Sequence, residues 1–427
     1  MVGKTKQGKS KLLEHLARQL IALGQGCGVL DPHSDLADDL LAALHGDLAD
    51  PALRARVIYL QPGRTDTLVP FNVLHSPHDP YTTAQHVLEA FRRTWPETLA
   101  EAPRFTNILL AALLVLIQAR RTLVELPRFL TDPAFREPLL ARSQNAEAVR
   151  FFRDRYDRWG REQALMVEAV LNKVGALALN PILRRMLGTP DNALPFRRIL
   201  DEGKVLLVDL GRVDGETRRL LGSLIMTGLE QAALSRKDVP RAQRRPFYFL
   251  LDEFQDYCAN AGSTQTLSRM LSECRKFGLH LGLAHQTVGQ LADAQLKVVF
   301  ASGRETARQL VGELHQPSLT QVKHDVRDLD WRERSHPLYY TLPEQWERLI
   351  QDAQRLPPRV ALVQRPGRAG ALRLRTVTLP TGRLSPEALA DLQRDLASSS
   401  GRPIVEVDTP DPAPALDHYE PIGERAV

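Results

Sequence analysis

Four short runs of hydrophobic residues each end in polar residues, and together they predict a parallel sheet. The runs are residues 27–30, 205–208, 247–251 and 279–284, and the polar residues that follow them are Asp31, Asp209, Asp252 with Glu253, and His285 with Gln286. Continuous apolar runs of this length are typical of strands buried on both faces, as in parallel sheets covered by helices. Because ligands bind beyond the carboxyl ends of such strands, we expect these polar side chains to face one crevice. A fifth run, residues 297–301, is expected to form an outer strand.

The stretch from residue 80 to residue 200 has helical periodicity and no clear strand, so it predicts an all-helical domain inserted into the sheet domain. The predicted boundaries are a split core at 1–75 and 203–340, the helical insert at 76–202, a small C-terminal α/β segment at 341–395 and a disordered tail at 396–427.

The C-terminal third combines one helical pattern with two strand patterns. Residues 344–354 are expected to be helical, and residues 359–363 and 372–379 alternate like the strands of a small hairpin around Gly367 and Gly370. From about residue 396 onward Ser, Pro, Gly and Asp dominate, which is typical of disorder.

The composition is that of a globular protein. The chain has 427 residues, of which 43% are hydrophobic and 25% charged, which leaves room for two or three domains. The longest apolar run, residues 108–117, is about half of the roughly 20 residues that a membrane-spanning helix needs, so we expect no transmembrane segment. No signal peptide is expected, and the three cysteines form no C-x-x-C pair, so the composition fits a reducing cytoplasm.

The formal net charge of +5 gives weak support for a nucleic-acid partner. The basic residues are scattered and mostly mixed with acidic ones, so on charge alone a solvated surface is the better interpretation.

The first residues of the chain carry a nucleotide-binding motif. Gly3, Gly8, Lys9 and Ser10 spell G-x-x-x-x-G-K-[ST], the phosphate loop. The backbone N–H groups of such a loop cradle phosphates, the Lys reaches the β- and γ-phosphates, and the Ser hydroxyl holds Mg²⁺. A helix with apolar residues on one face follows over residues 10–23, as the motif requires. The residues expected to bind the nucleotide are Gly3, Lys4, Thr5, Gly8, Lys9, Ser10 and Lys11.

A buried strand should precede the phosphate loop, but only Met1 and Val2 lie upstream of it. Either the natural start lies further upstream, or the chain is a fragment, or another segment fills that position in the sheet. We expect the first of these.

Asp252 and Glu253 end an apolar strand, which is the second requirement of a P-loop NTPase. The first acid supports Mg²⁺, so Ser10 and Asp252 are the expected metal ligands. The second acid, Glu253, is the expected general base for the attacking water. Acidic residues at the end of a strand also cap the helix that follows. Judged on Asp252 and Glu253 alone, this structural interpretation is as good as the catalytic one. The complete phosphate loop favours the catalytic interpretation.

Three further polar positions are functional candidates. Gln286 would sense the γ-phosphate or the attacking water, whereas His285 is better interpreted as structural. Arg275 is the first candidate for an arginine that completes the site of a neighbouring subunit, and Arg304 is the second. For Asp31, a place near the nucleotide and a simple Asp-Pro turn are equally good interpretations.

Several segments, taken in order, resemble the HerA/FtsK-like DNA-pumping ATPases, most closely the conjugative coupling proteins of type IV secretion, the TraG/TraD type. Besides the phosphate loop and the acidic strand end, the segments are Asp31-Pro32-His33, Arg275-Lys276-Phe277-Gly278 and Ala284-His285-Gln286. The resemblance covers roughly residues 3 to 315. Lys6 stands where the family has a glycine, and the membrane-anchoring helices of many members have no counterpart.

The resemblance implies an α/β fold, a RecA-like P-loop NTPase core with a largely parallel sheet and an inserted all-helical domain. It also implies a homo-hexamer that uses ATP and Mg²⁺ to move single- or double-stranded DNA, together with other secretion or conjugation components. A cytoplasmic place is expected, and attachment at the inner membrane through partners stays open.

Two other functions stay open beside the DNA translocase. One is a secretion-system ATPase that moves protein or assembles a pilus, and the other is a nucleotide-binding adaptor that does not hydrolyse ATP. An ABC-type ATPase is disfavoured, because no L-S-G-G-Q-like segment follows the helical stretch. Pore loops are hard to place, although the small polar residues 259–266 are a candidate.

Overall fold

A five-stranded parallel sheet with strand order β2-β4-β1-β5-β6 forms the centre of the protein. Its strands are β1 (Gly26–Asp31), β2 (Val57–Leu60), β4 (Val205–Asp209), β5 (Phe247–Leu251) and β6 (Leu279–Leu283). The computed structural model describes residues 1–95, 103–257, 270–285, 296–314, 318, 320–327, 335–366, 370–380, 382 and 384–404. The four strands predicted from the hydrophobic runs are confirmed.

The sheet is buried on both faces, and this explains the continuous hydrophobic runs. In β4, Leu206 and Val208 pack into the hydrophobic cluster that contains the apolar residues of α13 (Gly215–Leu234). Their neighbours Val205 and Leu207 point to the opposite face, which packs against three helices. These helices are α1 (Lys9–Ala22), α2 (Asp35–Leu44) and α17 (Pro386–Ser400).

The edge strand β2 was not predicted. It has only four residues, Val57–Leu60, and no acidic residue follows it directly. Its neighbour in the sheet is β4, with Ile58 opposite Leu206. A short helix, α3 (Pro51–Arg54), precedes it.

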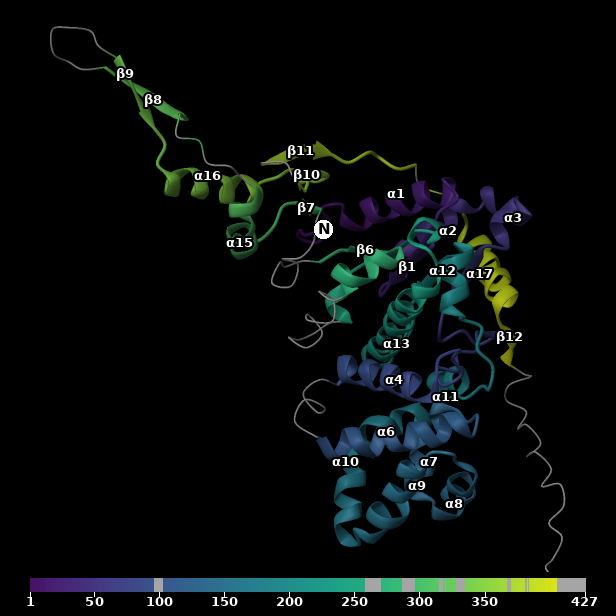
Figure 1. The fold of residues 1–427 in the computed structure, drawn as a ribbon. Helices are drawn as coiled ribbons and strands as arrows, with labels where there is room; N and C mark the ends of the chain where they lie inside the picture. Colours follow the sequence, from purple (N-terminus) through teal and green to yellow (C-terminus); the bar gives the residue numbers. More distant parts are fainter. Residues whose placement is uncertain are drawn as a thin grey trace, which may run out of the picture.

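The inserted domain is helical, as predicted, and lies below the core in Figure 1. Its helices are α4 (Pro80–Thr94), α6 (Pro103–Gln118), α7 (Leu126–Thr131), α8 (Pro133–Arg142), α9 (Ala146–Arg150), α10 (Arg161–Leu179) and α11 (Pro181–Leu187). The chain returns to the sheet through α12 (Phe196–Glu202). The apolar residues of the insert belong to the same cluster as the α13 face of the sheet, so one hydrophobic core joins the two parts.

A second, antiparallel sheet with the order β11-β10-β7 adjoins the first. Its strands are β7 (Lys297–Val299), β10 (Val360–Gln364) and β11 (Ala371–Arg375), so the predicted hairpin is confirmed. β7 was expected as an outer strand, but it lies between β10 and the isolated bridge from Val2 to Val299. The two helices beside this sheet are α15 (Arg304–Leu314) and α16 (Leu342–Gln354).

Two peripheral features complete the fold. β8 (Val322–Arg327) and β9 (Ser335–Tyr339) form an antiparallel arm that projects away from the body in Figure 1. The expected disordered tail began at residue 396, but α17 continues to Ser400 and β12 (Arg402–Pro403) pairs with β3 (Thr67–Leu68). Residues 405–427 lie outside the described part of the chain.

Within the described residues, no helix is both long enough and apolar enough to cross a membrane.

A buried ion pair joins the insert to the core. Arg93 Nη2 of α4 donates to Glu230 Oε2 of α13 at 2.6 Å, and both side chains are at most 2% exposed. Nearby, Trp95 Nε1 donates to Glu216 Oε1 at 2.8 Å. Both contacts connect α4 with α13, the helix that covers one face of the sheet.

We predict that Glu230→Leu lowers the free energy of unfolding by about 3–5 kcal/mol, because it removes the buried partner at 2.6 Å from the Arg93 guanidinium and leaves it only the longer 3.7 Å contact with Glu89. Urea denaturation measures this change. The matched control is Glu147→Ala, which breaks an exposed ion pair with Arg150 and should cost less than about 1 kcal/mol. Equal losses in the two variants would contradict the prediction.

Candidate nucleotide-binding site

Backbone hydrogen bonds hold the start of the phosphate loop between the two sheets. Val2 N donates to Val298 O (2.8 Å), and Gly3 N donates to His285 O (3.2 Å). Lys4 N donates to Ala301 O at 2.7 Å. Val2 thereby forms parallel bridges both to the end of β6 and to β7. Val2, directly before Gly3, thus pairs with both neighbours at the position where the motif requires a strand.

The loop then turns into α1. Lys6 and Gly8 both have positive φ values, +62° and +107°, and Gly8 is the N-cap of the helix. A glycine adopts this backbone conformation without strain, whereas a lysine does so at a cost of about 1 kcal/mol. The N–H groups of the loop and the positive end of the α1 dipole together favour a bound anion at this point.

The functional side chains of the loop converge on the end of β5. Ser10 Oγ donates to Asp252 Oδ2 at 2.6 Å, and Lys9 Nζ lies 3.7 Å from Glu253 Oε1. Lys9 Nζ also donates to Gly3 O (2.8 Å) and Lys4 O (3.2 Å), and the residue is only 5% exposed. Residues that are 242 positions apart in the chain therefore form one site.

The two acids at the end of β5 differ in their surroundings. Burial raises the pKa of Asp252, and the hydrogen bond from Ser10 acts in the opposite direction. Glu253 has a left-handed backbone (φ +41°), and its Oε2 accepts a 2.6 Å hydrogen bond from Gln255 Nε2. Asp252 and Ser10 present the hard oxygen ligands that Mg²⁺ prefers, so the donor set fits this ion beside a phosphate loop.

The remaining loop residues lie at the surface. Lys4 and Thr5 are exposed, and Lys11 Nζ donates to Glu14 Oε2 (2.8 Å) and to Asp39 Oδ2 (2.6 Å). Because these carboxylates occupy the Lys11 side chain, a contact of Lys11 with the nucleotide would come from its backbone N–H.

His285 supports the loop through its backbone. Its N–H donates to Met1 O at 2.9 Å, and its carbonyl accepts from Gly3. The ring is 8% exposed and packs edge-on against Phe254 at 4.7 Å, and burial lowers its pKa. Gln286, the predicted sensor, lies outside the described residues, as do residues 259–266.

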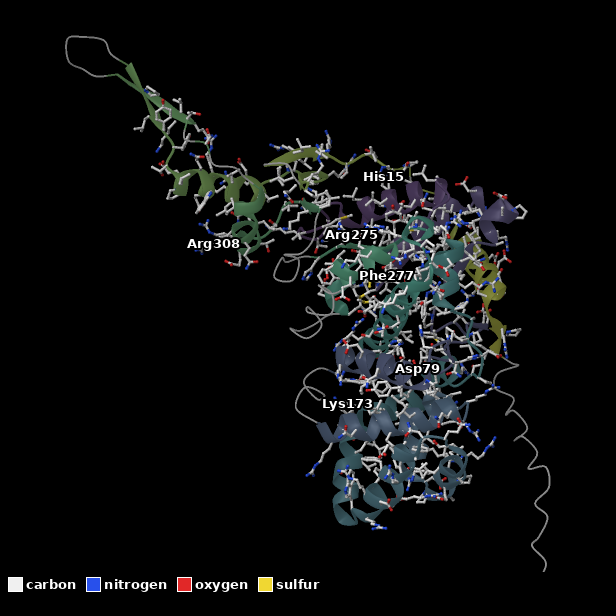
Figure 2. All side chains as sticks on the ribbon, in the orientation of Figure 1. His15, Asp79, Lys173, Arg275, Phe277 and Arg308 are labelled. Carbon is white, nitrogen blue, oxygen red and sulfur yellow. The ribbon has the colours of Figure 1, made fainter. Side chains whose placement is uncertain are left out.

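The two candidate arginines lie far from the phosphate loop of their own chain or are already paired. Arg275 is exposed in the short 3₁₀ turn Cys274–Phe277, directly before β6 (Figure 2). The loop adjoins the other end of β6, about 17 Å away for a strand of five residues. Arg304 Nη2 donates to Glu347 Oε2 at 2.8 Å. The Arg275 side chain therefore lies too far from the phosphate loop of its own chain to contact it.

Asp31 has a structural role in this geometry. Its Oδ1 accepts from His33 N and its Oδ2 from Ala37 N, both at 2.9 Å, so the side chain caps the start of α2. These contacts support the interpretation of Asp31 as part of an Asp-Pro turn, the second of the two interpretations open from the sequence. Burial raises the pKa of Asp31 to about 6, and the charges of Asp209 and Asp252 act in the same direction.

A further contact at the loop was missed from the sequence. Arg359, directly before β10, donates its backbone N–H to Gln7 O at 3.0 Å and has a φ of +69°. Val360 N donates to Pro357 O, so residues 357–360 form a turn with Arg359 at a position that favours glycine. The pair Pro357-Pro358 is typical of a turn, but nothing in the local sequence indicates a contact with the phosphate loop.

Solved structures of other proteins share this architecture. The conjugative coupling protein TrwBdeltaN70, in its unbound monoclinic form, aligns with a TM-score of 0.62 and 18% identity, over 91% of this chain and 86% of that one. The fold is that of the conjugative coupling proteins. The predicted class, a RecA-like core with an inserted helical domain, is confirmed.

Two other solved structures align with most of the chain. TrwB in complex with ADP and Mg²⁺ aligns with a TM-score of 0.58 at 18% identity, over 89% of this chain and 84% of that one. VirB4 of Thermoanaerobacter pseudethanolicus aligns with a TM-score of 0.52 at 13% identity, over 89% and 88%. No protein-family model matches the chain, and the comparison with curated proteins finds no match.

The raised pKa of Asp31 predicts a pH dependence of stability. The native carboxyl binds its proton more tightly than the unfolded one, so its contribution to stability is present below about pH 4 and is lost as the pH rises to about 6. Asp31→Asn should flatten the fall in unfolding free energy between pH 4 and pH 6. The control Asp154→Asn changes an exposed carboxylate and should leave that slope unchanged. Urea unfolding at several pH values measures both, and an unaltered slope in Asp31→Asn would refute the prediction.

Proposed function

We propose that this chain is an ATP-driven DNA translocase that acts as a coupling ATPase of conjugative transfer or type IV secretion. One observation carries the proposal: Lys9, Ser10, Asp252 and Glu253 meet at the carboxyl edge of the sheet in a coupling-protein fold. A neighbour with this fold was solved with ADP and Mg²⁺. ATP and Mg²⁺ are therefore the proposed cofactors.

Each residue of the site has a proposed chemical role. The loop N–H groups and Lys9 bind the phosphates, and Ser10 with Asp252 would hold Mg²⁺. When bound, the ion neutralises phosphate charge. Glu253 accepts the proton of the attacking water, and the hydrogen bond from Gln255 orients this carboxylate. Gln286 is the proposed sensor of the γ-phosphate.

The position of Arg275 supports a ring assembly. An exposed arginine at the far end of β6 would stabilise phosphate charge across an interface between copies. The proposed assembly is the homo-hexamer that the resemblance to the coupling proteins implies. DNA and other secretion or conjugation components are the proposed partners, and we propose a cytoplasmic protein attached to the inner membrane through them.

The similarity to VirB4 favours a second candidate, a secretion-system ATPase that moves protein or assembles a pilus. Stimulation of hydrolysis by DNA separates the two candidates. The non-hydrolysing adaptor is disfavoured, because the loop, both acids and the support of the loop start are in place.

We predict that the protein hydrolyses ATP, that single- or double-stranded DNA stimulates the rate, and that Lys9→Ala and Glu253→Gln each lower kcat by about 100-fold or more. Lys9→Ala should also weaken nucleotide binding, whereas Glu253→Gln should retain it, because the carboxylate acts on water and not on the phosphates. Lys237→Ala, at an exposed lysine after α13, is the matched control and should keep full activity.

Hydrolysis that ignores DNA would reject the DNA translocase and favour the protein-moving ATPase. Nucleotide binding without hydrolysis in the unaltered protein would instead favour the adaptor.

A mixing experiment tests the role of Arg275. Arg275→Ala and Glu253→Gln should each be inactive alone. An equal mixture should regain about a quarter of the activity, because about one interface in four then combines an intact Glu253 with an intact Arg275. Arg304→Ala mixed with Glu253→Gln is the comparison. No recovery with Arg275→Ala, but recovery with Arg304→Ala, would transfer the role to Arg304.

A further inference from the structure

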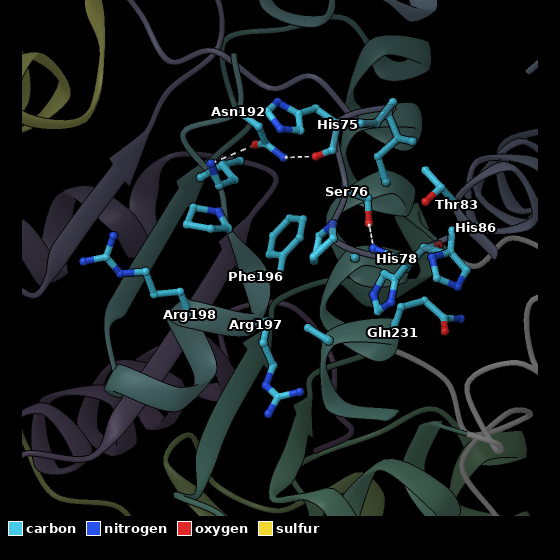
Figure 3. Close-up of a pocket in the computed structure, with 18 of the residues that line it drawn as sticks. His75, Ser76, His78, Thr83, His86, Asn192, Phe196, Arg197, Arg198 and Gln231 are labelled. Carbon is cyan, nitrogen blue, oxygen red and sulfur yellow. Dashed lines mark hydrogen bonds between the residues drawn. The ribbon is translucent and has the colours of Figure 1, made fainter. Parts of the chain in front are cut away.

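A cavity of about 620 Å³ lies where the helical insert joins the core, and residues 71–78 and 192–198 line two of its sides (Figure 3). Arg197 and Arg198 in its wall are each paired with carboxylates of the chain, so these contacts select no class of ligand. The contacts between the second sheet and the phosphate loop are more specific.

Arg359 connects the second sheet to the end of the phosphate loop. It directly precedes β10, which lies with β11 beside the start of α1 in Figure 1. Its N–H donates to Gln7 O at 3.0 Å. Its Cα and its Cγ each lie 3.7 Å from the position that a Cβ on Gly8 would occupy. The backbone of Arg359 therefore packs directly against the last two residues before Lys9.

The hydrogen bond from Arg359 fixes the orientation of the peptide unit between Gln7 and Gly8. In a planar trans peptide the C=O and N–H groups point in opposite directions. Because Gln7 O is turned toward Arg359, Gly8 N–H points away from that residue. This N–H finds no acceptor among the residues that the structure describes, and it belongs to the loop whose N–H groups cradle phosphates.

Arg359 makes this contact with a left-handed backbone, at a φ of +69°. A residue other than glycine keeps such a backbone only where its surroundings enforce it. Thr376 N donates to Arg359 O at 2.8 Å, and Arg359 Nη2 donates to Thr376 O at 3.2 Å and to Thr378 Oγ1. The segment after β11 thus holds Arg359 in the conformation that the contact with the loop uses.

We propose that Arg359 is a positioning residue of the nucleotide site and acts through Gly8. Its backbone N–H orients the Gly8 N–H toward the phosphates of a bound nucleotide, and its side chain holds that backbone in place. The inference rests on the proposed nucleotide site, but binding of ADP tests it without hydrolysis and without DNA.

Two substitutions separate the backbone from the guanidinium, because both remove the charge. Arg359→Gly keeps the N–H and adopts a positive φ without strain, whereas a β-branched valine is strongly disfavoured there, so Arg359→Val turns the N–H away from Gln7. In isothermal titration calorimetry with Mg²⁺, ADP should bind at least about ten-fold more weakly to Arg359→Val, since a hydrogen bond to a charged group is lost. Arg359→Gly loses only the side-chain hydrogen bonds, so its loss should be about two- to three-fold.

Steady-state hydrolysis gives a second readout, which a merely structural role would not change. Ser10, Asp252 and Glu253 keep their places in Arg359→Val, so the KM for ATP should rise by about ten-fold or more while kcat stays within about three-fold. A loss of folded protein would instead lower kcat and leave KM unchanged.

The matched control is a second arginine with a left-handed backbone. Arg120, at a φ of +52°, follows α6 in the helical insert. Arg120→Val introduces the same backbone conflict away from the phosphate loop, so it should leave the affinity for ADP and the KM for ATP unchanged. Thermal melts followed by circular dichroism compare the stability of Arg120→Val and Arg359→Val.

Equal weakening of ADP binding in Arg359→Gly and Arg359→Val would overturn the proposal, because the nucleotide would then need the guanidinium and not the backbone N–H. Unchanged binding in Arg359→Val, or equal weakening in Arg120→Val, would overturn it as well. If the unaltered protein binds ADP but hydrolyses no ATP, the ATPase is rejected and the comparison of the two Arg359 variants still decides this inference. If the unaltered protein binds no ADP, both proposals are rejected.

Discussion

The site depends on a few backbone hydrogen bonds that hold residues 2–4 between the end of β6 and β7. Val2 pairs with both strands, and Gly3 and Lys4 continue the pairing to His285 and Ala301. The approach is so close that a Cβ on Gly3 would lie 2.6 Å from Phe300 Cβ, which explains glycine at this position. With the loop held there, α1 begins in register with the end of β5, and Ser10 meets Asp252.

The burial of both faces of the sheet determines which acids are available for chemistry. Asp209 accepts hydrogen bonds from the side chains of Ser34, Tyr59 and Gln61 and from Gly211 N, so its oxygens are fully used. Asp31 is likewise occupied by the start of α2. The described contacts of Asp252 are to Ser10 and to the following N–H, which suits a metal ligand better. Equivalent positions on neighbouring strands thus divide into two carboxylates whose oxygens are used within the fold and one, Asp252, with fewer described contacts.

The helix α13 has two roles that follow from its position. One side covers the sheet, and the other carries Glu230, which pairs with Arg93 of the insert. The buried ion pair fixes α4 on α13, because separation would break the 2.6 Å contact between two buried charged groups.

The sequence by itself determined the elements that local patterns encode: four strands with their polar ends, the β10–β11 hairpin, the helical insert and the phosphate loop with its acidic partner strand. It did not reveal β2, the pairing of Val2, the end of α17 or the contact of Arg359 with the loop. These features depend on which backbone groups lie opposite each other after the chain has folded. A single bridge residue, a four-residue edge strand or a turn has too few residues to show a periodic pattern, and contacts between distant segments leave no local pattern, so only the tertiary structure could decide these features.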